Sequence, residues 1–147
     1  MVKAAMTTDG TLVIMEEKEK LKEGYIRESL DRSTFLISPE IKVKSESNIL
    51  FGKILNTALL ELNILLDKEI GKIGYIIEVS IEKDYEIQQW EQTFISIKIP
   101  IQDPKYINQL WKKVSEKIWK KVYLIEEDIE KIKKISHDIV IVLEILE

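Results

Sequence analysis

Residues 75–101 read YIIEVSIEKDYEIQQWEQTFISIKIPI, and this stretch decides the fold. Apolar residues alternate with polar ones at its start, and alternation resumes at Thr93 after a polar interval. Because successive side chains of a strand point to opposite faces, each run predicts a strand with one buried face. The polar interval from Lys83 to Glu91 predicts a long hairpin arm. The residues predicted to face the core are Tyr75, Ile77, Val79, Ile81, Thr93, Ile95, Ile97, Ile99 and Ile101, and those predicted to face outward are Glu78, Ser80, Glu82, Phe94, Ser96 and Lys98.

Helical patterns flank this hairpin on both sides. Upstream, the capping residues at 45–48 precede a long apolar stripe with helical spacing that Gly71 is expected to end. Downstream, Asp103 and Pro104 are a typical opening for a second helix, which a short further helix is expected to follow. The stripe of the first helix consists of Phe51, Ile54, Leu55, Ala58, Leu59, Leu62, Leu65 and Leu66.

Two outer strands complete the pattern. Alternation from Phe35 to Val43 predicts a first strand, although Pro39 interrupts it and indicates an edge or a bulge. The final strand is predicted from Asp138 to Leu146. It is apolar at both odd and even positions, so we expect both of its faces to be covered.

The resulting order, β-α-β-β-α-β, predicts an α+β protein with a ferredoxin-like, split βαβ arrangement. Its antiparallel sheet would carry the helices on one face. We expect a single domain over residues 1–147, with the sandwich at 34–147 and an N-terminal appendage at 1–33. The appendage would hold a β-hairpin turning at Asp9-Gly10 and a polar helix from Glu16 to Asp31.

Composition limits the classes of function. The 147 residues contain no cysteine, which excludes disulfides and thiolate chemistry. The acids and bases are mostly Glu and Lys, and there are only three prolines. This bias is typical of a thermophilic protein, although an AT-rich genome gives similar usage. The N-terminus carries no apolar signal segment and no apolar run approaches roughly 20 residues, so a cytoplasmic protein without membrane association is expected.

No motif in the chain predicts catalysis, a cofactor or a metal. His137 is followed directly by Asp138, but adjacent strand residues point to opposite faces, so a polar turn is the simpler interpretation. The arm carries carboxylates without the spacing or the glycine of a calcium loop. These carboxylates are Glu82, Asp84, Glu86 and Glu91. We therefore expect a protein that is not an enzyme.

Surplus apolar residues predict an interaction module that self-associates as a homodimer. Leu50, Leu60 and Ile64 lie outside the core stripe of the first helix. Trp90 and Phe94 point away from the isoleucine face of the third strand, so that face should be covered by the hairpin, a second subunit or a ligand.

The alternative function is nucleic-acid binding by the second helix. Lysines on one side could pair with phosphates while an exposed Trp119 stacks on a base. The net charge of −4 counts against this, because no global positive field draws the protein to nucleic acid. The candidate contact residues are Lys112, Lys113, Lys117, Trp119, Lys120 and Lys121.

Overall fold

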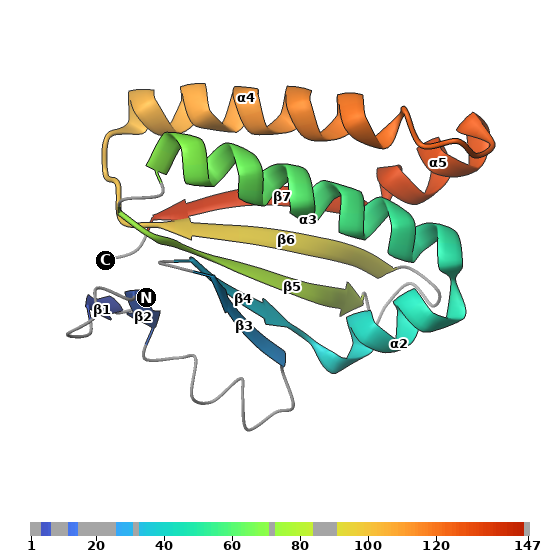
Figure 1. Ribbon diagram of the computed structural model, residues 1–147, viewed down its shortest axis with the longest axis horizontal. Helices are drawn as coiled ribbons and strands as arrows, with labels where there is room; N and C mark the ends of the chain where they lie inside the picture. The colour runs from blue at the N-terminus through green and yellow to red at the C-terminus, as the bar shows by residue number, and fades with distance from the viewer. Residues whose placement is uncertain are drawn as a thin grey trace.

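The computed structural model describes residues 4–6, 12–14, 26–30, 33–70, 73–83 and 91–145. Its strands are β1 (Ala4–Met6), β2 (Leu12–Ile14), β3 (Ile26–Leu30), β4 (Ser33–Ile37), β5 (Tyr75–Lys83), β6 (Glu91–Ile99) and β7 (Ile139–Ile145). Its helices are α2 (Pro39–Ser47), α3 (Ile49–Ile70), α4 (Pro104–Val122) and α5 (Ile129–His137). The two long helices, α3 and α4, lie side by side over one face of the sheet (Figure 1). The predicted α+β class is confirmed.

The sheet is mixed and has the order β3-β4-β5-β6-β7. β4 runs parallel to β5 and β6 runs parallel to β7. Between these pairs β5 and β6 are antiparallel, with Ile77 opposite Ile97. The hairpin predicted from residues 75–101 is therefore the centre of the sheet.

The predicted ferredoxin-like strand order and fully antiparallel sheet are wrong. A split βαβ arrangement inserts a strand between the two strands that a helix connects, whereas here each helical connection joins direct neighbours. The two parallel pairs point in opposite directions, yet α3 and α4 pack against each other on one face. The two crossovers must therefore have opposite hands. Because about 98% of such connections are right-handed, one crossover in this fold is of the rare left hand.

The first strand is shorter than predicted. β4 ends at Ile37, Ser38 precedes the helix with extended dihedral angles, and Pro39 occupies the first turn of α2. Proline fits that position because its fixed φ suits a helix and its missing N–H would have no partner there. Ile41 is consequently a buried helical residue, and Val43 is an exposed one.

At the N-terminus, β1 and β2 pair in antiparallel fashion, with Ala4 opposite Ile14. The polar helix predicted to reach Asp31 is wrong over residues 26–30, which form β3 and pair with β4. The backbone N–H and C=O groups of this segment form hydrogen bonds with the open edge of β4. The apolar spacing that suggested a helix here is weak, so strand pairing is preferred. Residues 16–25 lie outside the described part of the chain.

The core lies between the helices and the sheet. α3 begins with Asn48 as its cap, since the Phe51 N–H donates to Asn48 Oδ1 at 3.1 Å. The predicted stripe of α3 is confirmed except at Leu59, which is only half-buried. The buried α4 residues that meet it are Leu110, Val114, Ile118 and Val122.

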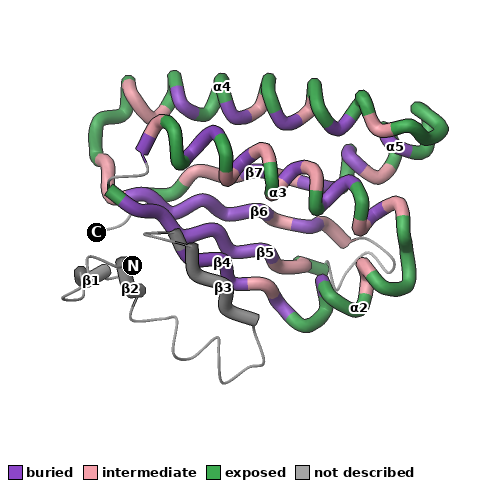
Figure 2. Tube along the Cα trace, in the orientation of Figure 1, coloured by how far each residue is buried: buried purple, intermediate pink, exposed green. Residues whose placement is uncertain are grey.

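The sheet face opposite the helices is also buried over its centre (Figure 2). Leu36 and Ile76 are buried there, as is the ion pair of Glu78 with Lys98 at 3.9 Å. The expectation that Glu78, Ser96 and Lys98 face solvent is therefore wrong, although they do lie on the predicted face. A charged pair tolerates burial because each group neutralises the other.

β7 forms one edge of the sheet, with β6 as its only neighbour in the described residues. Ile139 and Ile141 are buried under the helices, whereas Val140, Val142 and Leu143 are half-buried and Ile145 is exposed. The prediction that both faces of this strand are covered is thus wrong toward its end, because no further strand or helix flanks it within the described part of the chain.

Candidate interaction surfaces

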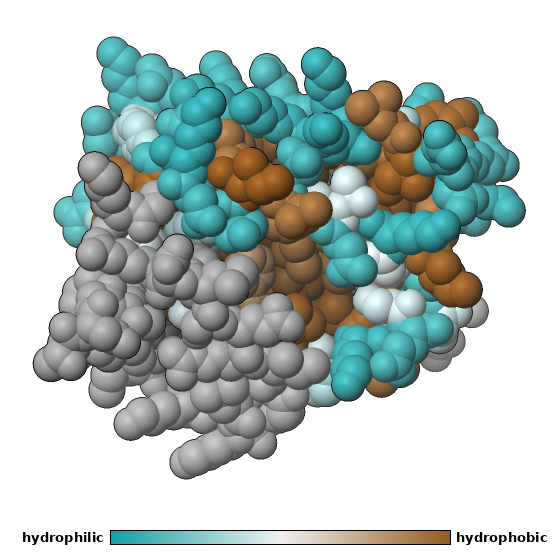
Figure 3. Space-filling model, in the orientation of Figure 1, coloured by the Kyte–Doolittle hydropathy of each residue, from teal (hydrophilic) through white to brown (hydrophobic). Residues whose placement is uncertain are grey.

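One apolar surface runs along α3. Ile49, Leu60 and Ile64 fall on one side of this helix and are 74%, 60% and 54% exposed. They point away from the stripe that packs on the sheet, because a helix can bury only the side that meets other elements. Hydrophobic surface is visible over α3 in Figure 3, below the hydrophilic surface of α4. We call Ile49, Leu60 and Ile64 the α3 stripe.

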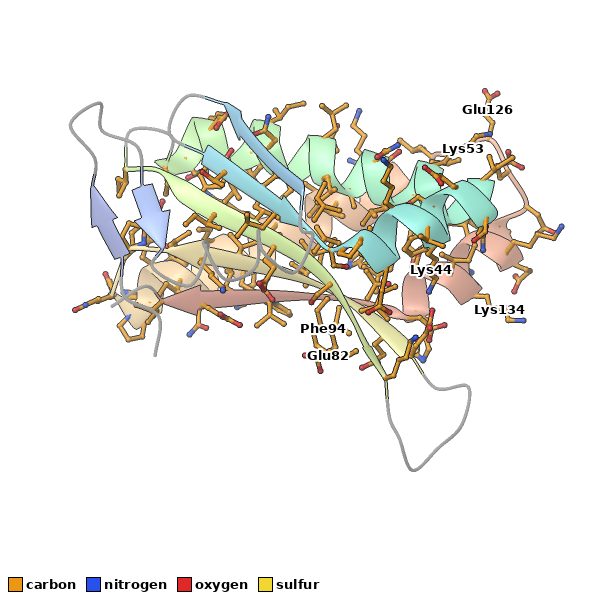
Figure 4. All side chains as sticks on the ribbon, turned by 90° about the horizontal axis from the view of Figure 1, so that it is seen from below. Lys44, Lys53, Glu82, Phe94, Glu126 and Lys134 are labelled. Atoms are coloured by element: carbon orange, nitrogen blue, oxygen red, sulfur yellow. The ribbon has the colours of Figure 1, made fainter. Side chains whose placement is uncertain are left out.

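The five predicted interaction residues do not form one surface. Leu60 and Ile64 belong to the α3 stripe, and Leu50 is half-buried beside it. Phe94 lies on the opposite side of the sheet, where Figure 4 shows it near Glu82 on the face away from the helices. It is half-buried between Ser80 of β5 and Val140 of β7. Trp90 lies outside the described residues.

The predicted nucleic-acid residues all lie on α4. The five lysines, Lys112, Lys113, Lys117, Lys120 and Lys121, are exposed. Lys113 also donates to Glu69 Oε1 of α3 at 3.2 Å. Trp119 is half-buried against the core and stacks on Tyr123, with ring centroids 6.4 Å apart. The lysines thus form a charged outer surface of α4, with an aromatic pair at its end.

A pocket of about 610 Å³ lies where α2, α3 and α5 meet. The apolar pattern of the sequence did not predict this pocket, because its residues come from two segments, 44–51 and 127–138, that are far apart in the chain. Lys44 on its wall donates to Glu91 Oε1 at 2.7 Å and lies 4.6 Å from the centre of the Phe51 ring. This lysine therefore fastens α2 to β6 and α3. The lining residues are Lys44, Asn48, Ile49, Leu50, Phe51, Glu127, Lys131, Lys134, Ile135 and Asp138.

His137 and Asp138 lie at the end of α5, and both are exposed. Asp138 follows the helix as its C-cap and its N–H donates to the Ile135 carbonyl. Among the arm carboxylates, Glu82 is exposed and Glu91 pairs with Lys44, while Asp84 and Glu86 lie outside the described residues. Within the described ranges, no three His, Asp or Glu side chains are grouped so that they could hold a metal ion.

Tyr75 forms a polar junction that the sequence did not indicate. Its hydroxyl lies 2.6 Å from both Asn63 Oδ1 and Asp67 Oδ1, on the last turns of α3. The ring is fully buried at the start of β5. Because a buried hydroxyl needs a partner, these contacts fix the end of α3 to the first residue of the central strand.

α3 is also, by length and composition alone, apolar enough to cross a membrane. The segment is not an uninterrupted apolar run, because Asn56, Glu61 and Asn63 lie within it. In the fold, its stripe of buried residues packs on the sheet, and core helices of globular domains commonly meet the same criterion.

Comparison of the chain with protein-family models, with curated proteins and with solved structures finds no match.

Proposed function

We propose that this chain is a non-enzymatic protein-interaction module that self-associates through the α3 stripe. The observation that carries the proposal is the exposure of Leu60 and Ile64 one turn apart on a helix whose other side is core. Because a little over half of each side chain is exposed, covering it contributes about 1–2 kcal/mol, so a partner at this position gains affinity without rearranging the fold. The proposed setting is the cytoplasm of a thermophile.

The charges around the stripe favour a second copy as the partner. Lys53 lies one turn from Asn56 on the same side of α3 and is paired with Glu127 at 2.9 Å. The charge of Lys53, which lies one turn after Ile49 on this side of the helix, is therefore already neutralised within the chain. A surface of this kind can meet its own copy without placing unpaired like charges together.

The test is the mass of the protein in solution, measured by light scattering over a range of concentrations. We expect a mass above the 17.2 kDa of one chain, and a lower mass after Leu60→Lys combined with Ile64→Lys. Glu116→Lys is the matched control, because it raises the net charge by the same two units at an exposed position of α4 outside the α3 stripe. A wild-type mass of one chain at high concentration contradicts self-association, and an unchanged mass in the double variant contradicts the α3 stripe.

Nucleic-acid binding by α4 is the second candidate function. It is favoured by the exposure of all five lysines beside the Trp119–Tyr123 aromatic pair. Phosphates would contact the lysines and a base would stack on the aromatic rings. A cluster of lysines on one helix can act locally even when the net charge is −4.

This candidate is tested by titrating tryptophan fluorescence with a mixed-sequence oligonucleotide at low and at high salt. Binding should quench the fluorescence and weaken steeply as salt is raised. Glutamate at 112, 113, 117, 120 and 121 should abolish it, whereas Lys68→Glu on α3 should not. A flat signal at low salt rules out this function.

A further inference from the structure

The outer edge of β7 has an unusual composition for a sheet edge. Its first five residues are Ile139-Val140-Ile141-Val142-Leu143, and Glu144 is its only charged residue. Natural sheets protect their edges with charges, prolines, bulges or short strands, because an open edge pairs readily with other strands. β3, at the opposite edge, follows this rule with Arg27 and Glu28 among its five residues. β7 does not.

The backbone of β7 is arranged to accept another strand. The Thr93 N–H of β6 donates to the Asp138 carbonyl, so the carbonyl of residue 138 points toward β6. Because backbone polar groups alternate along a strand, those of the four odd-numbered residues point away from β6. These residues are Ile139, Ile141, Leu143 and Ile145. No strand in the described part of the chain takes up their donors and acceptors.

We propose that β7 pairs in antiparallel fashion with β7 of a second copy, which joins the two sheets into one. A two-fold axis at Val142 aligns all seven residues of both strands. It places Ile139 opposite Ile145 and Ile141 opposite Leu143, so that only apolar side chains meet under the helices. Glu144 then faces Val140 and not its own copy. The outward-pointing odd residues form the hydrogen-bonded pairs of this ladder.

The helix layer supports the same contact. α4 contacts α3 on one flank through Lys113, and it also contacts β7. Trp111 lies about 160° around the helix from Lys113 and is 46% exposed. Two copies joined at β7 place their α4 helices beside each other, because adjacent strands are about 5 Å apart and packed helices 8–10 Å apart. The second copy then covers Trp111.

The β7 contact uses a different surface from the α3 stripe, so variants of each surface can test the two contacts separately. In the chain carrying Leu60→Lys and Ile64→Lys, the β7 contact alone should hold two copies together, giving twice the mass of one chain. Adding Val142→Lys should reduce the mass to one chain, because the two lysines would face each other across the axis where strands approach most closely. Glu82→Lys is the matched control, since it adds positive charge to the same sheet face on an interior strand.

A charge swap tests the register. Mixing the Val142→Lys chain with a Val142→Glu chain in the same background should restore the mass of two copies. Hydrogen exchange gives a second measurement that does not depend on the mass in solution. The amides of Ile141 and Leu143 should be protected in the paired protein and should exchange rapidly after Val142→Lys, while circular dichroism stays unchanged.

The outcomes separate this inference from the proposed function. If the Leu60→Lys/Ile64→Lys chain already has the mass of one chain with freely exchanging Ile141 and Leu143 amides, the β7 pairing of copies is wrong, and the edge is open to a strand of another protein. The α3 stripe is then still supported by the drop in mass from the wild type. Failure of the charge swap overturns the two-fold register at Val142.

Discussion

α3 and α4 lie side by side on the same face of one sheet, yet they are built differently. α3 contacts α2, α4 and α5 besides the sheet, and eight of its 22 residues are buried. α4 contacts α3 and β7 at the margin of the layer, and four of its 19 residues are buried. The position of a helix within the layer therefore decides how much of its circumference is apolar. α4 has one buried side and a lysine-rich outer side, whereas α3 is apolar beyond what its neighbours cover.

Truncation along α3 should show the largest effect, because it separates the covered side from the uncovered one. Leu62→Ala removes a fully buried side chain and should lower the free energy of unfolding by about 2–5 kcal/mol. Leu60→Ala makes the same chemical change at an exposed position and should cost roughly 0.5 kcal/mol or less in a dilute sample. Urea unfolding followed by circular dichroism measures both. Equal losses would show that the outer side of α3 is covered within the single chain.

The helix caps should give an intermediate effect that is the same in both helices. Asp103 accepts from the Lys105 N–H at 3.1 Å, and Asn48 accepts from the Phe51 N–H at the same distance. Replacing either with alanine should lower the free energy of unfolding by about 1 kcal/mol. Asp103→Asn keeps an acceptor and serves as the control, with little change expected. A much larger loss at Asn48 would indicate that the α2–α3 junction depends on this residue beyond its cap.

The ion pair that links the two helices should have the smallest effect. Lys113 Nζ and Glu69 Oε1 are 3.2 Å apart, and the lysine side chain is more than half exposed. A double-mutant cycle with Lys113→Ala and Glu69→Ala should give a coupling free energy of about 0–1 kcal/mol that disappears in high salt. The cycle of Lys112→Ala with Glu69→Ala, at the neighbouring exposed position, should give no coupling. A salt-independent coupling would mean that the pair is shielded from solvent, for example by a second copy.

The period of the apolar residues predicted an element correctly where that element buries one side only. Alternation placed β5 and β6, and helical spacing placed the buried stripe of α3, because both elements bury one side only. The prediction of a strand beyond Pro39 was wrong, because apolar and polar residues continue to alternate by chance across the start of α2. The prediction of a helix over residues 26–30 was also wrong, because pairing with β4 prevailed over a weak helical spacing.

The candidate surfaces were predicted less completely. Leu60 and Ile64 were identified because they fall outside the core stripe of the helix, and both are exposed in the structure. The pocket between α2, α3 and α5 and the buried Glu78–Lys98 pair were not foreseen, since residues distant in the chain create both. The open edge of β7 was not foreseen either, because its apolar sequence is equally typical of a central strand.

Apart from α2, the sequence by itself determined the order and type of the elements from β4 onward, since these follow from the period of the apolar residues. Only the tertiary structure decided which strands are neighbours. If both crossovers were right-handed, both helices lay on one face and β5 paired with β6, the two strands of at least one crossover could not be neighbours, as in the predicted split arrangement. In the observed order one crossover is left-handed, and the two strands that each crossover connects are direct neighbours. Hydrophobic periodicity carries no information on handedness, because burial depends on which face a side chain occupies and not on the path by which the chain arrived there.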